Sequence, residues 1–174
     1  MNSTVDAEFI LELLNTPKFI RYIGDRGVRT VEQARDFIEN RYRQSYREHG
    51  YGLYLVQTHV RATDLLGRSE ADRIAALLTN KPIGMCGFVR RDTLPGPDLG
   101  FAFLPEYEGK GYGFEAAQAM LEHGRDKLGF SKVFAITSQD NNVSGKLLEK
   151  LGFMFDRIFT TPEGEDLKLF EKQL

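Results

Sequence analysis

The sequence contains no tryptophan and only one cysteine, Cys86. One thiol cannot close a disulfide within the chain, so the sequence does not have the pattern of a small disulfide-stapled secreted domain. Cys86 lies in the apolar run 83–89, and free cysteine packs as a small hydrophobe. We therefore expect Cys86 to be an inert, buried strand residue in a protein of a reducing compartment.

Long apolar runs and an excess of charge of one sign are also missing. No run approaches the roughly 18 apolar residues of a membrane-spanning helix, and no N-terminal signal pattern is present. Lys and Arg number 23 and Asp and Glu 25, for a formal net charge of −2. Because both signs are scattered along the chain, the sequence lacks the clustered basic residues that a nucleic-acid-binding surface needs. We expect a cytoplasmic protein with no membrane and no nucleic-acid partner.

The three histidines are too far apart to suggest a metal centre. His49, His59 and His123 follow none of the spacings that metal ligands show in sequence. The sequence therefore predicts no metal site.

Hydrophobic periodicity predicts one mixed α/β domain over residues 1–174, which is an ordinary length for a single domain. Helices are expected over 4–14, 17–22, 31–49, 114–128 and 141–151, and strands over 51–58, 82–90, 98–104, 131–138, 153–161 and 166–171. Residues 61–80 are interpreted as an insertion with a short helix of its own. Because strands and helices do not alternate strictly, the pattern favours a mixed sheet with helices on its faces.

The most informative stretch is an apolar strand, 98–104, that leads into Gly109, Gly111 and Gly113 and then into a helix. Glycines accept positive φ and let the backbone approach a ligand, while a helix N-terminus attracts anions. A P-loop would need Gly-Lys followed by Ser or Thr, and a dinucleotide fingerprint would need its last two glycines three positions apart. Neither spacing is present, so the stretch indicates a phosphate-binding turn of another kind.

Two blocks of residues resemble the GNAT superfamily of acetyl-coenzyme A-dependent N-acetyltransferases. The first is Phe103-Leu104-Pro105 followed by Glu108-Gly109-Lys110-Gly111-Tyr112-Gly113, with Glu108 where the family carries Gln or Arg. The second, about thirty residues later, contains Asn141, Ser144 and Glu149-Lys150-Leu151-Gly152-Phe153. The blocks look most like the RimJ/RimL branch, which acetylates the N-termini of ribosomal proteins.

The resemblance implies a twisted, mostly antiparallel sheet with helices on both faces and acetyl-CoA bound where two strands splay apart. Backbone N–H groups of the turn would bind the pyrophosphate, and Lys110 would add a cationic contact. The splayed strand would pair its backbone with the pantetheine arm, which Asn141 would also contact. The implied cofactor-binding residues are Phe101, Phe103, Leu104, Glu108, Gly109, Lys110, Gly111, Tyr112, Gly113, Asn141 and Ser144.

The same resemblance suggests catalytic residues. Many family members place a tyrosine at the position of Leu148 to protonate the leaving thiolate, and we assign that role to Ser144 instead. The general base is assigned to Asp98, with Glu106 as a second candidate. The alternatives are that Ser144 and Asn141 are helix-capping residues, worth about 1 kcal/mol each, and that both carboxylates are merely solvated.

The sequence therefore predicts an N-acetyltransferase that moves acetyl directly to a primary amine, because no covalent nucleophile is evident. A protein N-terminal α-amine is the expected acceptor. A small amine such as a polyamine, amino acid or antibiotic is the alternative, as are a non-catalytic CoA-binding sensor and an interaction module. Residues 1–5 are too short for the family's first strand, and an open sheet edge would favour a homodimer. Candidate residues of the acceptor pocket are Phe19, Tyr22, Arg26, Tyr42 and Tyr46.

Overall fold

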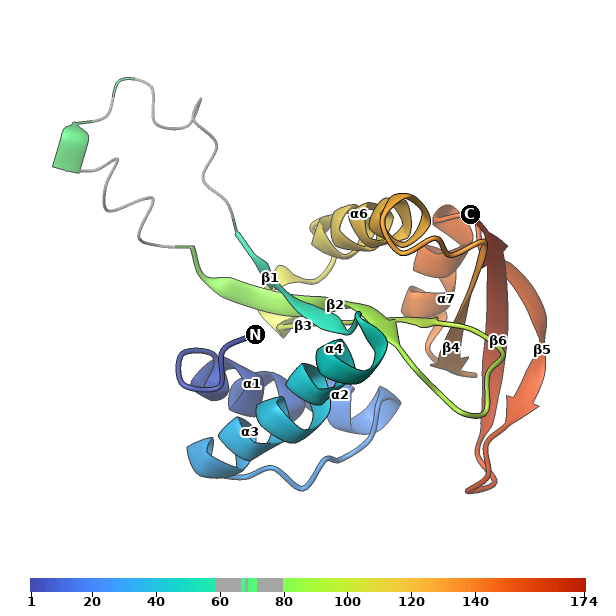
Figure 1. Cartoon of the computed structure of the whole chain (residues 1–174), viewed down its shortest axis with the longest axis horizontal. Helices are drawn as coiled ribbons and strands as arrows, with labels where there is room; N and C mark the ends of the chain where they lie inside the picture. The colour runs from blue at the N-terminus through green and yellow to red at the C-terminus, as the bar shows by residue number, and fades with distance from the viewer. Residues whose placement is uncertain (59–66, 68, 72–79) are drawn as a thin grey trace.

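A six-stranded sheet runs through the computed structural model, which describes residues 1–58, 67, 69–71 and 80–174 (Figure 1). The strand order is β1-β2-β3-β4-β6-β5, and only the β3–β4 neighbours are parallel. The expected mixed, mostly antiparallel sheet is thus confirmed. The strands are β1 (Leu53–Gln57), β2 (Pro82–Val89), β3 (Asp98–Phe103), β4 (Lys132–Ser138), β5 (Met154–Thr160) and β6 (Asp166–Gln173).

The N-terminal helices pack on one face of β1, β2 and β3 (Figure 1). They are α1 (Ala7–Leu14), α2 (Pro17–Tyr22), α3 (Val31–Phe37), the π-helix η1 (Ile38–Arg43) and α4 (Gln44–His49). Thr30 and Gln33 form a capping box at the start of α3, and Gly50, with φ +75°, ends α4. Fully buried Ile10, Leu13 and Ile38 form the core of this half.

Two later helices, α6 (Tyr112–Asp126) and α7 (Asn142–Lys150), cover the other face of the sheet. Ala117 and Leu121 of α6 and Leu148 of α7 share a core with strand residues such as Phe88 and Phe170. Gly124 permits close packing of α6, because a Cβ there would lie 2.8 Å from the Phe88 ring. Helices therefore cover both faces, as expected.

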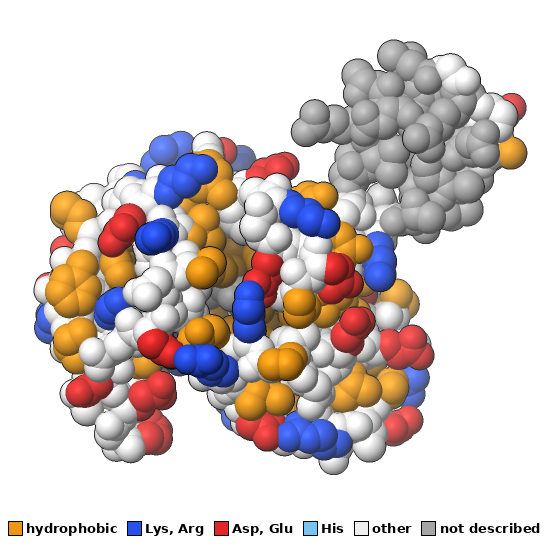
Figure 2. All heavy atoms as spheres, turned by 180° about the vertical axis from the view of Figure 1, so that it is seen from behind, with side chains coloured by type: hydrophobic (Ala, Val, Ile, Leu, Met, Phe, Trp, Pro, Cys, Tyr) orange, Lys and Arg blue, Asp and Glu red, His pale blue; other side chains and the backbone are white. Residues whose placement is uncertain are grey.

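The face of β4, β5 and β6 opposite α7 has a smaller core of its own. Its cluster contains Leu94 from the β2–β3 loop together with strand residues Phe134, Ile136, Phe159 and Leu169, and none of the residues described there belongs to a helix. The N-terminal helices lie beside this face rather than over it (Figure 1). Figure 2 shows the resulting hollow between the two halves of the molecule.

Two details at the sequence level differ from a simple periodic interpretation. The helix expected over 31–49 is interrupted by the π-helix η1, and the helix expected over 4–14 begins only at Ala7, after a turn at residues 3–5. The predicted insertion, 61–80, lies outside the described residues except for 67, 69–71 and 80. Among the described helices, none is both long enough and apolar enough to cross a bilayer.

Candidate functional site

Strands β3 and β4 separate almost as soon as they meet. Their ladder contains one register pair, Asp98 with Phe134, where the Phe134 N–H donates to the Pro97 carbonyl at 2.9 Å. On the opposite side of β3, the Leu104 N–H donates to the Ile83 carbonyl of β2 at 2.9 Å. Because successive strand residues direct their backbone groups to opposite sides, residues 101 and 103 present theirs to the gap. The expected splay is therefore present.

The glycine turn follows directly from the splayed strand. A short 3₁₀ helix, η3 (Pro105–Tyr107), leads to Gly109 at φ +70° and Gly111 at φ +91°, and Gly111 is the N-cap of α6. Both glycines occupy the left-handed region that other residues avoid. The unpaired N–H groups and positive dipole end of the 15-residue α6 thus lie at the end of the splay.

Gly113, unlike Gly109 and Gly111, does not have a positive φ angle. It lies inside α6, and a Cβ there would be 3.4 Å from Leu147 and 3.5 Å from Phe103, which are ordinary contact distances. The fold itself therefore tolerates the methyl group of an alanine at position 113. Any requirement for glycine there comes from a ligand.

Leu104, which the sequence assigned to the ligand, has another function in the structure. Its side chain is 1% exposed in the N-terminal core, and its N–H is bonded to β2. Neither its side chain nor its N–H is available to the gap, so Phe101 and Phe103 are the strand residues that present backbone groups there.

Asn141 and Ser144 lie where the chain passes from β4 into α7. The Asn141 Oδ1 caps α7 by accepting the Ser144 backbone N–H at 3.2 Å, as the capping alternative predicts. The Ser144 hydroxyl is half-buried and has no hydrogen-bond partner among the described residues. The cap therefore fixes the backbone of Ser144 and leaves its hydroxyl available.

Two other positions are excluded from chemistry by burial. Leu148 is 1% exposed in the core beneath α7 and provides no acid group. Cys86 is also buried, and burial raises the pKa of its thiol to about 12. Because the thiolate is the nucleophilic form, Cys86 is unsuited to accept an acetyl group.

Asp98 lies at the point where β3 and β4 part. It is 2% exposed, its Oδ2 pairs with the Arg91 Nε at 2.5 Å, and its Oδ1 has no partner among the described residues. Burial raises the pKa of Asp98 to about 6, although Arg91 and the neighbouring Ile136 amide act in the opposite direction. Asp98 is thus not a solvated carboxylate, whereas Glu106 on η3 is exposed.

Helix α2 forms ion pairs with both the glycine turn and the segment that follows β4. Lys18 pairs with Glu108 at the start of the glycine turn, and Arg21 pairs with Asp140 after β4 at 2.6 Å. Neither contact was predicted from the sequence, since the partners are far apart in the chain and carry no local pattern. Lys18 offsets the negative charge of Glu108, so the departure from Gln or Arg at this position is compatible with an anion in the turn.

The candidate acceptor residues divide into two groups. Phe19 and Tyr42 are buried in the N-terminal core, and the Tyr46 hydroxyl donates to the Leu53 carbonyl of β1. These three aromatics therefore stabilise the helical half instead of lining an open pocket. Tyr22 and Arg26 lie in the segment that leaves α2, where the Tyr22 carbonyl accepts a hydrogen bond from Ser138 of β4 at 3.5 Å.

The splay and the turn together define an α/β protein in which one strand parts from its neighbour and leads into a glycine turn at a helix N-terminus. Comparison with models of known protein families identifies the family to which the chain belongs. The model of the acetyltransferase (GNAT) domain family matches residues 2–154. The chain therefore belongs to the GNAT acetyltransferase family and is an N-acetyltransferase.

Individual relatives agree with this assignment. The chain is 26% identical over 151 residues to the uncharacterized N-acetyltransferase p20 of Bacillus licheniformis, which covers 85% of this chain and 73% of the relative. An acetyltransferase of Agrobacterium tumefaciens matches the fold with a TM-score of 0.71 at 18% identity, over 97% of this chain and 85% of that one. The spermidine N-acetyltransferase of Vibrio cholerae, solved with CoA and spermine, matches with a TM-score of 0.70 at 14% identity, over 97% and 89%.

Proposed function

We propose that the chain binds acetyl-CoA in the gap between β3 and β4 and transfers its acetyl group directly to a primary amine. The observation that carries the proposal is the unpaired backbone at Phe101 and Phe103, which continues into a glycine turn at a helix N-terminus. An extended amide-containing arm fits the first feature and a pyrophosphate fits the second. The residues present therefore fit the coenzyme.

In this proposal, backbone groups supply most of the hydrogen bonds to the coenzyme. N–H groups of residues 109–113 would donate to the pyrophosphate, and charge-assisted hydrogen bonds of this kind contribute about 1.5 to 3 kcal/mol each. Lys110 lies on the exposed turn, with its ammonium 5.8 Å from the Tyr107 ring, and supplies a nearby positive charge. The Asn141 amide nitrogen is left to donate to the pantetheine arm, because its oxygen is engaged in the cap.

The bound coenzyme supplies an activated acetyl thioester, and the chain's own residues manage the protons. Ser144 would donate a proton or a hydrogen bond to the departing thiolate sulfur. Asp98 accepts a proton from the incoming amine, through an intervening water because the carboxylate is buried. An α-amine with a pKa near 8 is already roughly a tenth neutral at pH 7, so it needs little help from a base.

For the acceptor we propose a protein N-terminal α-amine, as in the RimJ/RimL branch, or a small molecule with a comparable amine. The small-molecule alternative is supported by the fold match to a protein named as a spermidine N-acetyltransferase. The proposed compartment is the cytoplasm, where acetyl-CoA is available and where a lone thiol such as Cys86 stays reduced.

We also propose a homodimer. Strand β5 is at the edge of the sheet, and its Met154, Phe155 and Ile158 side chains are largely exposed. An exposed apolar edge strand is a template for pairing with another chain.

A thiol-release assay tests the proposed transfer. Purified protein is mixed with acetyl-CoA and a panel of amines and N-terminal peptides, and mass spectrometry identifies the acetylated product. At least one acceptor should release CoA thiol well above the rate without an acceptor. Release that never exceeds the background across the panel would contradict the proposal.

A further inference from the structure

We propose that Arg91 is a positioning residue of the acetyl transfer, which keeps the Asp98 carboxylate ionised and turned so that its Oδ1 is left to accept the proton of the amine. The proposed function assigns the general base to Asp98, and the inference rests on that assignment. It adds the residue that controls the base, at a position that the sequence did not single out.

The β2–β3 loop, residues 90–97, fixes the position of Arg91. The Leu94 N–H donates to the Arg91 carbonyl at 3.2 Å, which closes a turn. Leu94 is buried and packs with Phe134 in the smaller core. The Pro97 carbonyl accepts the Phe134 N–H at 2.9 Å. The loop is therefore anchored to β4 at two points, which holds the backbone of Arg91 in place.

The contact between Arg91 and Asp98 engages only one of the two carboxylate oxygens. The Arg91 Nε donates to Asp98 Oδ2 at 2.5 Å, and the two side chains are 38% and 2% exposed. Asp98 Oδ1 is buried and has no hydrogen-bond partner among the residues that the structure describes. A buried polar atom without a partner is rare, because it gives up its hydrogen bonds to water without replacing them. Oδ1 is thus the oxygen left for the proton of the amine.

Arg91 also opposes the effect of burial on Asp98. Burial raises the pKa of Asp98 to about 6, whereas the charge and the hydrogen bond of Arg91 lower it, as does the Ile136 amide of β4 to a smaller extent. Without the guanidinium, the buried carboxyl would bind its proton more tightly, since burial disfavours the charged form. A protonated carboxyl cannot accept a proton, so the base depends on Arg91 near neutral pH.

The strands around Asp98 supply no competing charge. Strand β2 has no charged side chain, and the only charged residues of β3 and β4 are Asp98 and Lys132. Lys132 pairs with Glu171 of β6 at 2.6 Å. The two neighbours of Arg91 in the chain are opposite in charge and exposed. Among these segments, Arg91 is therefore the cation that pairs with Asp98.

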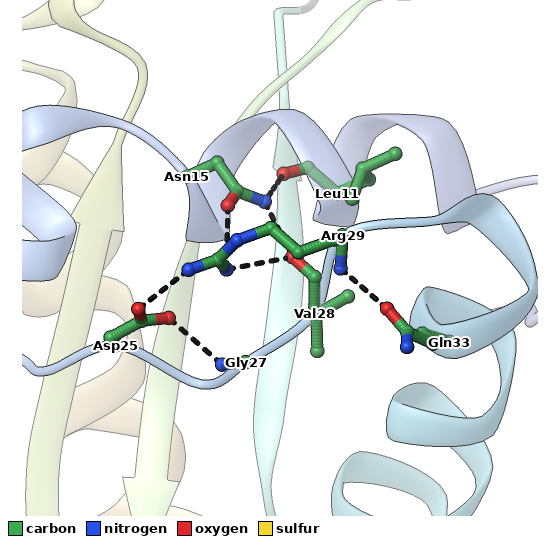
Figure 3. A network of polar contacts seen from close by, with 7 residues as sticks. All are labelled: Leu11, Asn15, Asp25, Gly27, Val28, Arg29 and Gln33. Atoms are coloured by element: carbon green, nitrogen blue, oxygen red, sulfur yellow. Dashed lines mark hydrogen bonds and ion pairs between the residues drawn. The ribbon is translucent and has the colours of Figure 1, made fainter.

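On the side of the helices, charged groups come from the loop between α2 and α3. Asp25 and Arg29 pair with each other at 2.5 Å within a network of polar contacts (Figure 3). Partial burial lowers the pKa of Arg26, which lies between them in sequence, and the charge of Arg91 is among those that lower it further. Because the carboxylate of Asp25 is engaged by Arg29, it does not compete with Asp98 for Arg91.

The proposed step moves one proton to Asp98. The amine nitrogen forms a bond to the acetyl carbon as the carbon–sulfur bond breaks, and the electron pair of that bond leaves with the thiolate. The proton that the nitrogen releases passes to Asp98 Oδ1 through a water. Arg91 acts on this step only through Asp98, by occupying Oδ2 and keeping the carboxylate charged.

The first test measures the titration of Asp98 in the full chain without any acceptor. Carbon-13 NMR of protein labelled at the aspartate carboxyl carbons follows the signal, and Asp98→Asn assigns it. Arg91→Gln should raise the pKa of Asp98 from about 6 to about 7 or higher, because a neighbouring arginine lowers an aspartate pKa by about 1 to 3.

The second test is the pH dependence of kcat/KM with the fastest acceptor of the thiol-release panel. The kcat/KM of Arg91→Gln divided by that of wild type should be constant above about pH 8 and about tenfold lower at pH 5, since a pKa higher by one reduces the ionised fraction about tenfold. The titration of the amine is the same for both proteins and cancels in this ratio. A purely structural defect would lower the ratio equally at every pH.

Further variants locate the effect at the ion pair. Arg91→Lys keeps the charge and should restore part of the wild-type pH profile. In the Asp98→Asn background, Arg91→Gln should change the profile no further. Arg90→Gln is the matched control, because Arg90 is an exposed arginine of the same loop with no ion pair among the described residues, and it should behave as wild type. Circular dichroism melting verifies folding, and if Arg91→Gln does not fold, Arg91→Lys carries both tests with a smaller expected change.

The outcomes separate this inference from the proposed function. An unchanged pKa of Asp98 in the folded Arg91 variants, or a ratio of kcat/KM that does not vary with pH, would overturn the inference while leaving the acetyl transfer intact. Thiol release that no acceptor raises above background would overturn the proposed transfer, and the inference with it.

Discussion

At the scale of single residues, Ser144 combines a constrained backbone with an available hydroxyl, since its N–H is bound by Asn141 and its side chain is not. If the hydroxyl assists departure of the thiolate, Ser144→Ala should lower kcat by about 10²-fold, the lower end for general acid catalysis. The Kd for acetyl-CoA, measured by calorimetry, should change less than about threefold, because the backbone of the turn supplies the phosphate contacts.

The matched control for this substitution is Ser131→Ala. Ser131 is an exposed serine just before β4, and its side chain has no hydrogen bond among the described residues. It should behave as wild type. An unchanged kcat in Ser144→Ala would contradict the catalytic role and leave Ser144 with only a structural role, in the first turn of α7.

Asp98 should give the pH–rate profile its acidic limb. With a pKa of about 6 in the folded protein, Asp98 becomes protonated below that pH and loses its capacity to accept a proton. The wild-type kcat/KM should therefore fall as the pH drops through about 6, and the Asp98→Asn profile should lack that limb. A limb retained unchanged in Asp98→Asn would assign the base elsewhere.

Asp98 should also make the stability of the protein depend on pH. This effect is expected whether Asp98 is a general base or has only a structural role. Since the pKa of Asp98 is raised on folding, the native state binds this proton more tightly than the unfolded state. Its contribution to the free energy of unfolding therefore declines by roughly 2 kcal/mol as the pH rises from about 4 to 6. Urea unfolding across this range should show Asp98→Asn gaining stability relative to wild type as the pH increases.

At the scale of elements, the turn before α6 separates two glycines that look alike in the sequence. Gly111→Val forces a branched residue into φ +91°, whereas Gly113→Ala places a methyl group at ordinary contact distances. Gly111→Val should abolish measurable acetyl-CoA binding by calorimetry. Gly113→Ala should melt close to wild type, so any loss of acetyl-CoA affinity reports the approach of ligand to backbone.

The order and type of the described elements were predictable because hydrophobic spacing, caps and glycines carry that information locally. Thr30 with Gln33 marks the start of α3, and Gly50 marks the end of α4. The π-helix η1 was not predictable, because a single wider turn leaves the apolar stripe almost unchanged. Its residues continue to bury Ile38 and Tyr42 as an α-helix would.

The site was predictable only where it is built from backbone. The glycine turn and the splayed strand follow from residues adjacent in sequence, and resemblance supplied the coenzyme. The contacts of Lys18 and Arg21 and the ion pair of Asp98 with Arg91 depend on tertiary packing. Phe19 was predicted to line a pocket because an aromatic residue suits both a pocket and a core, and only the packed structure distinguishes these environments.

At the scale of the whole molecule, the exposed edge of β5 predicts self-association. Analytical ultracentrifugation should find a dimer, and the double variant Phe155→Lys with Ile158→Lys should be a monomer that melts close to wild type, since both side chains are largely exposed. Val143→Lys is the matched control, because Val143 is an exposed apolar residue of α7 away from the edge. A wild-type monomer at all concentrations would contradict the proposed homodimer.

The central claim is that the gap between β3 and β4 is the acetyl-CoA site, and amide hydrogen exchange tests it most directly. Acetyl-CoA should slow exchange at the N–H groups of Phe101 and Phe103, which face the gap, and across the turn 109–113, while exchange in β5 remains unchanged. A second cavity, of about 370 Å³, lies between α6 and the C-terminal residues. Slower exchange only at amides lining that cavity, with unchanged exchange at Phe101, Phe103 and the turn, would contradict the claim.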